Sequence, residues 1–264
     1  MRKASSFQET TERVRRGKLD MSDYDSRLKN EIEHGQYLKE KGAGDIWGWE
    51  TVAGKKRWAR RVDMLTSHIE STTRVLELGC GSGYFTKELV KTDANITAID
   101  ISQDLLDMAI TKVQSKNVNF MIGNAYEMDF EDCSFDTVVG SSVLHHLEID
   151  LALKEICRVL KPTGSALFTE PNMLNPQIAL QKNVPYIKKK LGDSPDETAF
   201  FIWDIKRRFI RAGFNQDLIV FPFDFLHPNI PKSLVALIEP VCSFLEKIPI
   251  IKQISGSLFI KAIK

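Results

Sequence analysis

The middle of the chain alternates short apolar runs with longer stretches whose apolar residues recur at helical spacing. Runs of four to six apolar residues bounded by turn residues are typical of strands buried in a parallel sheet. The alternation predicts an α/β fold: a Rossmann-like, seven-stranded, mostly parallel sheet with helices on both faces. The first five predicted strands lie at 75–78, 96–100, 118–122, 135–140 and 165–170.

The flanking segments are less regular. Residues 1–70 begin polar and charged and predict an N-terminal helical lid or extension, whereas 71–264 form the main domain. Two insertions, at about 173–196 and 224–254, follow the fifth and sixth strands, and we expect both to wall a substrate pocket. A last strand at 257–262 is expected to run antiparallel to its neighbours.

Composition excludes several classes of partner. The 36 basic and 35 acidic residues leave a net charge of +1, so no global field favours nucleic acid, and no nucleic-acid partner is expected. The four cysteines form no CxxC pair, which argues against a zinc site or a disulfide framework, and no metal is expected. The charged N-terminus is unlike a signal peptide, and no apolar run approaches the roughly 20 residues that span a bilayer. These features predict a cytoplasmic protein.

The segment Val75 to Gly83, VLELGCGSG, carries the strongest chemical signal. Its glycines follow a strand and open a helix, so the backbone can turn tightly and approach a ligand closely. A nicotinamide dinucleotide site is the competing interpretation, but Tyr84 occupies the position where its third glycine is needed for helix–strand packing. Glu77 adds a carboxylate inside an apolar strand. A carboxylate there would repel a pyrophosphate and attract a cationic ligand, unless backbone amides alone satisfy it.

Asp100 closes the second strand at the spacing where an acid binds a ribose hydroxyl pair. The alternative is that Asp100 caps the next helix. Ser102 is equally suited to be the N-cap residue, which would leave Asp100 available for a ligand.

Five sequence blocks together resemble one known family. They are VLELGCGSGYFT at 75–86, AID at 98–100, GNAYEMDF at 123–130, FDTVVGSSVLHHL at 135–147 and RVLKPTGSALFTEPN at 158–172. In this order they resemble the class I S-adenosylmethionine-dependent methyltransferases, over about residues 74–172. The resemblance implies S-adenosylmethionine as the cofactor.

The resemblance also implies roles for individual residues. Glu77, Gly79 and Gly81 would line the methionine part of the cofactor and Asp100 would hold the ribose, while Ser141 and Ser142 would lie beside the sulfonium. Ile101, Asn124 and Ala125 would surround the adenine, although Asn124 stands where the family often has an aspartate. The full set of expected cofactor-binding residues is Trp47, Trp49, Glu77, Gly79, Cys80, Gly81, Asp100, Ile101, Asn124, Ala125, Tyr126 and Ser141.

Three residues are candidates for catalysis. His145 and His146 follow the fourth strand and Glu170 ends the fifth, so an imidazole and a carboxylate are expected to meet at one sheet edge. Some small-molecule oxygen methyltransferases similar to this chain use a histidine here as a base, and its near-neutral pKa suits that role. The alternative for each histidine is a packing role at the start of a helix.

Two further features have alternative interpretations. Trp47 and Trp49 either fold over the cofactor as part of a lid or dock the N-terminal helices on the core. The basic runs Arg57, Arg60, Arg61 and Lys188 to Lys190 are interpreted first as solvated helix faces. The alternative is that they bind a substrate phosphate or carboxylate.

The acceptor is the least determined part of the prediction. The position after the fourth strand lacks the (D/N)PPY block typical of amide and base nitrogen methylation. We therefore expect a small-molecule, sugar or lipid-linked acceptor, with a hydroxyl oxygen as the first choice and nitrogen as the alternative. Contact of the segment Ser233 to Ile260 with a membrane surface is possible, but core packing is favoured for it.

Overall fold

The computed structural model describes residues 21–41 and 48–264. Its strands are β1 (Arg74–Leu78), β2 (Asn95–Asp100), β3 (Val118–Ile122), β4 (Phe135–Ser141), β5 (Leu160–Pro171), β6 (Ile219–Phe223) and β7 (Ser257–Ile263). Its helices and 3₁₀ turns are α2 (Met21–Lys41), α4 (Val52–Thr66), α5 (Thr86–Leu89), η1 (Val90–Thr92), α6 (Gln103–Lys112), η2 (Leu144–His146), α7 (Ile149–Val159), α8 (Pro176–Asn183), α9 (Pro185–Lys190), α10 (Ile202–Arg211), α11 (Lys232–Leu245) and α12 (Pro249–Lys252).

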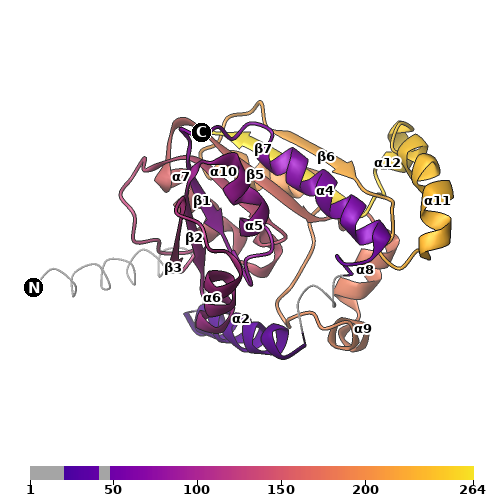
Figure 1. Cartoon of the computed structure of the whole chain (residues 1–264), viewed down its shortest axis with the longest axis horizontal. Helices are drawn as coiled ribbons and strands as arrows, with labels where there is room; N and C mark the ends of the chain where they lie inside the picture. Colours follow the sequence, from indigo (N-terminus) through magenta and orange to yellow (C-terminus); the bar gives the residue numbers. More distant parts are fainter. Residues whose placement is uncertain (1–20, 42–47) are drawn as a thin grey trace, which may run out of the picture.

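The seven strands form one sheet in the order β3-β2-β1-β4-β5-β7-β6 (Figure 1). Strands β1 to β5 pair in parallel, and β7 is antiparallel to both β5 and β6. The predicted fold class is therefore confirmed, including the antiparallel last strand. Strand order reverses between β1 and β4, which is where open sheets of this type bind ligands.

Apolar periodicity explains how the sheet is covered. In α7, Ile149, Leu153, Ile156 and Val159 recur at three- and four-residue spacing and are buried against the sheet. In β1, Val75, Leu76 and Leu78 are all buried, as expected for a central parallel strand covered on both faces.

The N-terminal helix α2 packs outside the sheet, alongside α6 (Figure 1). Leu38 and Leu105 form a small apolar cluster between the two helices. Beside it, Lys39 Nζ bonds Asp104 Oδ1 at 2.7 Å. Ser102 is the N-cap of α6, as predicted, with its side chain accepting from the Leu105 amide.

The expectation that core packing accounts for Ser233 to Ile260 is wrong for one face of α11 and α12. Leu237, Phe244 and Ile250 are 70%, 62% and 84% exposed. The opposite face of α11 is buried through Val235 and Cys242, which pack against Ala53 and Leu226. No helix among the described residues is both long and apolar enough to cross a membrane.

Candidate functional site

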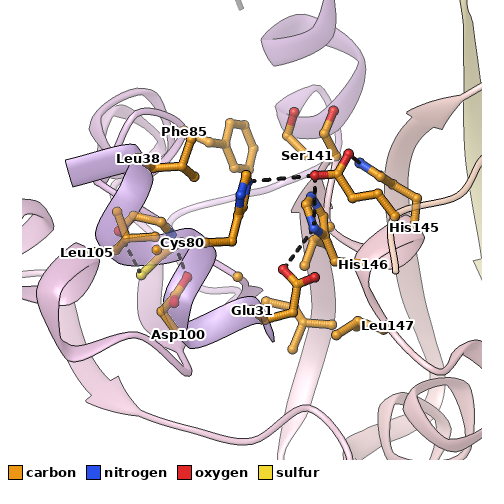
Figure 2. Close-up of a pocket in the computed structure, with 18 of the residues that line it drawn as sticks. Glu31, Leu38, Cys80, Phe85, Asp100, Leu105, Ser141, His145, His146 and Leu147 are labelled. Atoms are coloured by element: carbon orange, nitrogen blue, oxygen red, sulfur yellow. Dashed lines mark hydrogen bonds and ion pairs between the residues drawn. The ribbon is translucent and has the colours of Figure 1, made fainter. Parts of the chain in front are cut away.

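A cavity of about 370 Å³ opens at the carboxyl ends of β1, β2, β4 and β5. Figure 2 shows Asp100, Cys80 and Leu105 on one side of it and His145 and His146 on the other. The predicted residues that line it are Trp49, Glu77, Gly79, Cys80, Gly81, Asp100, Ile101, Asn124, Ala125, Tyr126, Ser141, His145 and His146. Trp47 lies outside the described residues.

The glycine turn after β1 forms one wall. Gly81 has φ +52°, and a side chain built on it would meet no atom within 4 Å, so the backbone here is open to the cavity. Its amide donates to Asp100 Oδ2 at 2.8 Å, which joins the turn to the end of β2. Backbone therefore approaches the cavity directly at this point, where a ligand can lie against it.

Glu77 projects into this wall from β1. It is 1% exposed, and its Oε2 has no hydrogen-bond partner among the described residues. Burial raises the pKa of Glu77 to about 8. A buried carboxylate oxygen without a donor is costly, so this position fits the ammonium or sulfonium of a cationic ligand.

Asp100 and the residues after β3 form the opposite end. Asp100 accepts from the amides of Gly81 and Ser102, while its own burial raises its pKa above the ordinary value. Asn124 Oδ1 accepts from the Tyr126 amide at 3.0 Å, and Tyr126 Oη accepts from the Glu148 amide at 2.8 Å. The carboxylate is thus fixed by backbone donors, with lone pairs left for the hydroxyls of a ligand.

The structure brings together the predicted imidazole and carboxylate. His145 Nδ1 lies 2.7 Å from Glu170 Oε2, and Glu170 also accepts from the amides of Val143 and Leu144. A carboxylate can only accept, so Nδ1 carries the proton in this contact and Nε2 is left as the proton-accepting nitrogen. Burial and the charge of His146 lower the pKa of His145, which keeps the ring neutral. Glu170 itself is fully buried behind the cavity wall.

His146 belongs to a second group that was not predicted from the sequence. Its Nδ1 lies 2.9 Å from Glu31 Oε2 and 3.7 Å from Glu197 Oε1 (Figure 2 shows the contact with Glu31). Burial opposes the charged ring, but Glu197 and Glu31 outweigh it and raise the pKa of His146 to about 9. His34 Nε2 lies 3.6 Å from Glu197 Oε1. Helix α2 is thus tied to the rest of the cavity wall through its polar residues.

A signal for this group was present in the sequence. Leu28, Glu31, His34 and Leu38 follow one another at the spacing of a single helix face, and all four line the cavity. Polar residues on an otherwise apolar helix face indicate that the face contacts a cavity or other polar groups as well as the hydrophobic core. Glu197, by contrast, lies in a loop whose position depends on long-range packing.

Ligand atoms of His145, His146 and Glu197 lie within 4.8 Å of one another, close enough to hold a metal ion. Lys182 Nζ already bonds Glu197 Oε2 at 2.5 Å and Asp193 Oδ2 at 2.9 Å. Its ammonium thus supplies the positive charge that a metal would bring to these acids.

Two of the arginines interpreted as solvated are not solvated. Arg61 is 4% exposed, and both it and Arg57 line the cavity and contact Asp224. The Trp49 ring packs 5.3 Å from the Trp58 ring and lies 5.4 and 5.3 Å from the guanidinium carbons of Arg57 and Arg61. A helix seen only as sequence does not show which of its basic residues turns inward.

The inserted segments contribute unequally to the wall. From 173–196, Ile178, Gln181, Lys182 and Asp193 line the cavity. None of the described residues of 224–254 lines it, contrary to the expectation that both insertions wall the pocket. This segment instead provides Asp224, which holds the two arginines from behind.

Comparison with known proteins agrees with this geometry. Residues 76–168 match the family model described as a methyltransferase domain. Over 183 residues the chain is 34% identical to a demethylmenaquinone methyltransferase of Staphylococcus aureus, a match that covers 60% of this chain and 74% of that protein. The chain belongs to the class I S-adenosylmethionine-dependent methyltransferases. Membership removes the alternative of a nicotinamide-dependent oxidoreductase.

Solved structures share the methyltransferase fold at low identity. A Thermotoga maritima S-adenosylmethionine-dependent methyltransferase, described as a possible histamine N-methyltransferase, superposes with a TM-score of 0.64 at 16% identity, covering 88% of this chain and 99% of that one. Haemonchus contortus phosphoethanolamine N-methyltransferase 2, solved with S-adenosyl-L-methionine, gives 0.59 at 20% identity, covering 78% and 52%. The unpartnered oxygen of Glu77 and the open backbone at Gly81 are features that S-adenosylmethionine fits.

Proposed function

We propose that this methyltransferase transfers a methyl group to a hydroxyl oxygen of a small-molecule, sugar or lipid-linked acceptor, with His145 as the base. The observation that carries the proposal is the 2.7 Å contact between His145 Nδ1 and Glu170 Oε2. It fixes the ring so that Nε2, which lies 3.9 Å from Glu197 Oε2, is the nitrogen able to take a proton. A hydroxyl is a poor nucleophile until it loses its proton, so such a base is what an oxygen acceptor requires.

The cofactor-binding roles are part of the same proposal. S-adenosylmethionine supplies a methyl group on a sulfonium cation, which is reactive without further activation. Glu77 would face its positively charged methionine end, and Asp100 would accept from the ribose hydroxyls. Ile101, Asn124, Ala125 and Tyr126 would surround the adenine, with Gly79, Cys80, Gly81 and Ser141 along the remaining wall and Trp49 in the covering segment.

The chain's own contribution to the reaction is alignment and proton removal. Glu170 holds the His145 ring, and the surrounding walls exclude water and orient the acceptor hydroxyl toward Nε2. Alignment of reactants accounts for roughly 7–11 kcal/mol of a barrier in well-oriented systems. A positioned base adds a factor of about 10² to 10⁴ in rate.

A quinone-type acceptor is the second candidate. The Staphylococcus aureus relative is named for demethylmenaquinone, and it is 34% identical to this chain. A base that ionises a ring hydroxyl also makes the adjacent ring carbon nucleophilic, so the same histidine serves methylation of a reduced quinone. Amines are the third candidate.

The test is a product assay over a panel of phenols, sugars, hydroquinones and amines, in which S-adenosylhomocysteine formation is measured. We expect transfer to a hydroxylated acceptor, and a loss of about 10² to 10⁴ in kcat for His145→Asn with cofactor affinity preserved. The matched control is His68→Asn, because His68 is exposed and outside the cavity. Methylation of amines alone would overturn the oxygen assignment, and an unchanged kcat in His145→Asn would overturn the base.

A further inference from the structure

Arg61 presents two hydrogen-bond donors that the described part of the chain does not use. The guanidinium Nη2 donates to Ser257 Oγ and lies 3.4 Å from Asp224 Oδ2. The remaining nitrogens, Nε and Nη1, are buried and have no hydrogen-bond partner among the described residues. A buried donor without an acceptor is costly, so a ligand oxygen that accepts from Nε or Nη1 of Arg61 would be stabilised there.

The acids near Arg61 are already shared or engaged. Arg57 Nε bonds Asp224 Oδ2 at 2.8 Å, so two arginines share one carboxylate. Glu170, whose charge also acts on Arg61, is bonded by His145 and by the amides of Val143 and Leu144, and Glu246 is bonded by Arg60. Burial and the neighbouring charge of Arg57, opposed by Asp224 and Glu170, lower the pKa of Arg61 to about 10. No carboxylate among the described residues therefore accepts from Arg61 Nε or Nη1.

Aromatic rings offset only part of this charge. Trp49 and Phe223 lie 5.3 and 5.4 Å from the Arg61 guanidinium carbon. A ring interacts with the face of the guanidinium plane, whereas the N–H bonds point outward within that plane. The Nε–H and Nη1–H bonds point to different sides of the guanidinium, so each stays available for a separate acceptor oxygen of an anionic ligand.

The position of Arg61 distinguishes the acceptor from the cofactor. Its partner Ser257 begins β7 and pairs in register with Pro171 at the end of β5. Glu77 lies on β1, and β4 separates β1 from β5, a lateral offset of about 9–10 Å at the usual strand spacing. Arg61 and Arg57 are therefore on the side of the cavity beyond His145 and Glu170, away from the glycine turn.

We propose that Arg61, supported by Arg57, binds an anionic oxygen group, a carboxylate or a phosphate, on the methyl acceptor. This inference rests on the proposed function and narrows it to acceptors that combine a hydroxyl with an acidic group. The unpartnered donors of Arg61 would hold the acceptor at one end and leave its hydroxyl to face His145.

The test measures anion binding without methyl transfer. The protein is saturated with S-adenosylhomocysteine and titrated with inorganic phosphate or with acetate at constant ionic strength. Tryptophan fluorescence is followed, because the Trp49 ring lies beside both arginines. The variants are Arg61→Gln and Arg57→Gln. The control is Arg60→Gln, whose side chain is 45% exposed and bound to Glu246.

We expect saturable binding of at least one anion to the wild type and to Arg60→Gln, weakened tenfold or more in Arg61→Gln. Preference for phosphate over acetate, or the reverse, identifies the acidic group. If Arg61→Gln does not fold, Arg57→Gln carries the same expectation, since Arg57 is less buried. Equal anion binding in the variants and the wild type, or none in the wild type, overturns the proposal.

A tenfold loss of S-adenosylhomocysteine affinity in Arg61→Gln would also overturn it, because Arg61 would then belong to the cofactor. This affinity is measured separately by calorimetry. Failure of the anion site with intact cofactor binding would leave the proposed methyl transfer standing, so the two proposals are tested independently.

Discussion

His146 holds a proton that the unfolded chain releases more readily, and this couples stability to pH. The carboxylates of Glu197 and Glu31 overcome the effect of burial and raise the pKa of His146 from 6.5 to about 9. A difference of this size corresponds to about 3 kcal/mol of folding free energy.

The sign follows from which state binds the proton. Below pH 6.5 His146 is protonated in both states and the stabilisation is fully present. As pH rises from 6.5 toward about 9, the unfolded chain loses the proton while the folded protein keeps it, so the stabilisation declines. Above about pH 9 the stabilisation from protonated His146 is absent. Replacing His146 with Gln removes this dependence, and it also removes the charge that lowers the pKa values of His145 and His34.

The assay is urea unfolding followed by tryptophan fluorescence, at about pH 6 and about pH 10. We expect wild type and His146→Gln to differ by about 3 kcal/mol at the lower pH and by much less at the higher pH. The exposed His68→Gln serves as the control and should show no such pH-dependent difference. The same gap between wild type and His146→Gln at both pH values would refute the reasoning.

Two further predictions concern the cofactor wall. Gly81→Ala adds a methyl group into open cavity space, so calorimetry should show the larger loss of S-adenosylhomocysteine affinity in this variant. Gly83→Ala adds a methyl group 3.0 Å from Ala109 Cα, so thermal unfolding should show the larger loss of stability in this variant. The reverse order of the two effects would contradict both placements. The pKa of Glu77 is about 8, so below that pH a bound cation should displace its proton. Calorimetry in buffers of different ionisation enthalpy should therefore detect proton release on ligand binding to the wild type and none in Glu77→Gln. Equal proton release in both proteins would contradict this prediction.

The sheet was predictable because each strand is a local apolar run. Strand β3 matches the predicted range at both ends, whereas β5 begins at Leu160, five residues before its predicted start at residue 165. Leu160 pairs with Phe135 across an irregularity in the register, and the turn residues that follow it look like a loop in the sequence. The meeting of His145 and Glu170 was predictable from topology, since neighbouring parallel strands end at one edge.

The remaining parts of the site depend on distant packing. Glu31, His146 and Glu197 come from three separate elements, so no local pattern shows that they converge. Arg61 looks like part of a solvated basic run, and its burial depends on distant contacts such as those with Asp224, 163 residues away, and Ser257, 196 residues away. Charge and spacing predict which residues are chemically able to act, but long-range contacts decide which of them meet.

The most direct test of the central claim is calorimetric titration of the wild type and of Asp100→Ala with S-adenosylmethionine and S-adenosylhomocysteine. We expect micromolar-range binding of both ligands to the wild type, with affinity falling tenfold or more in Asp100→Ala, about 1.4 kcal/mol or greater. Binding of neither ligand to the wild type, or equal affinity in the two proteins, would contradict the assignment of this cavity to the cofactor.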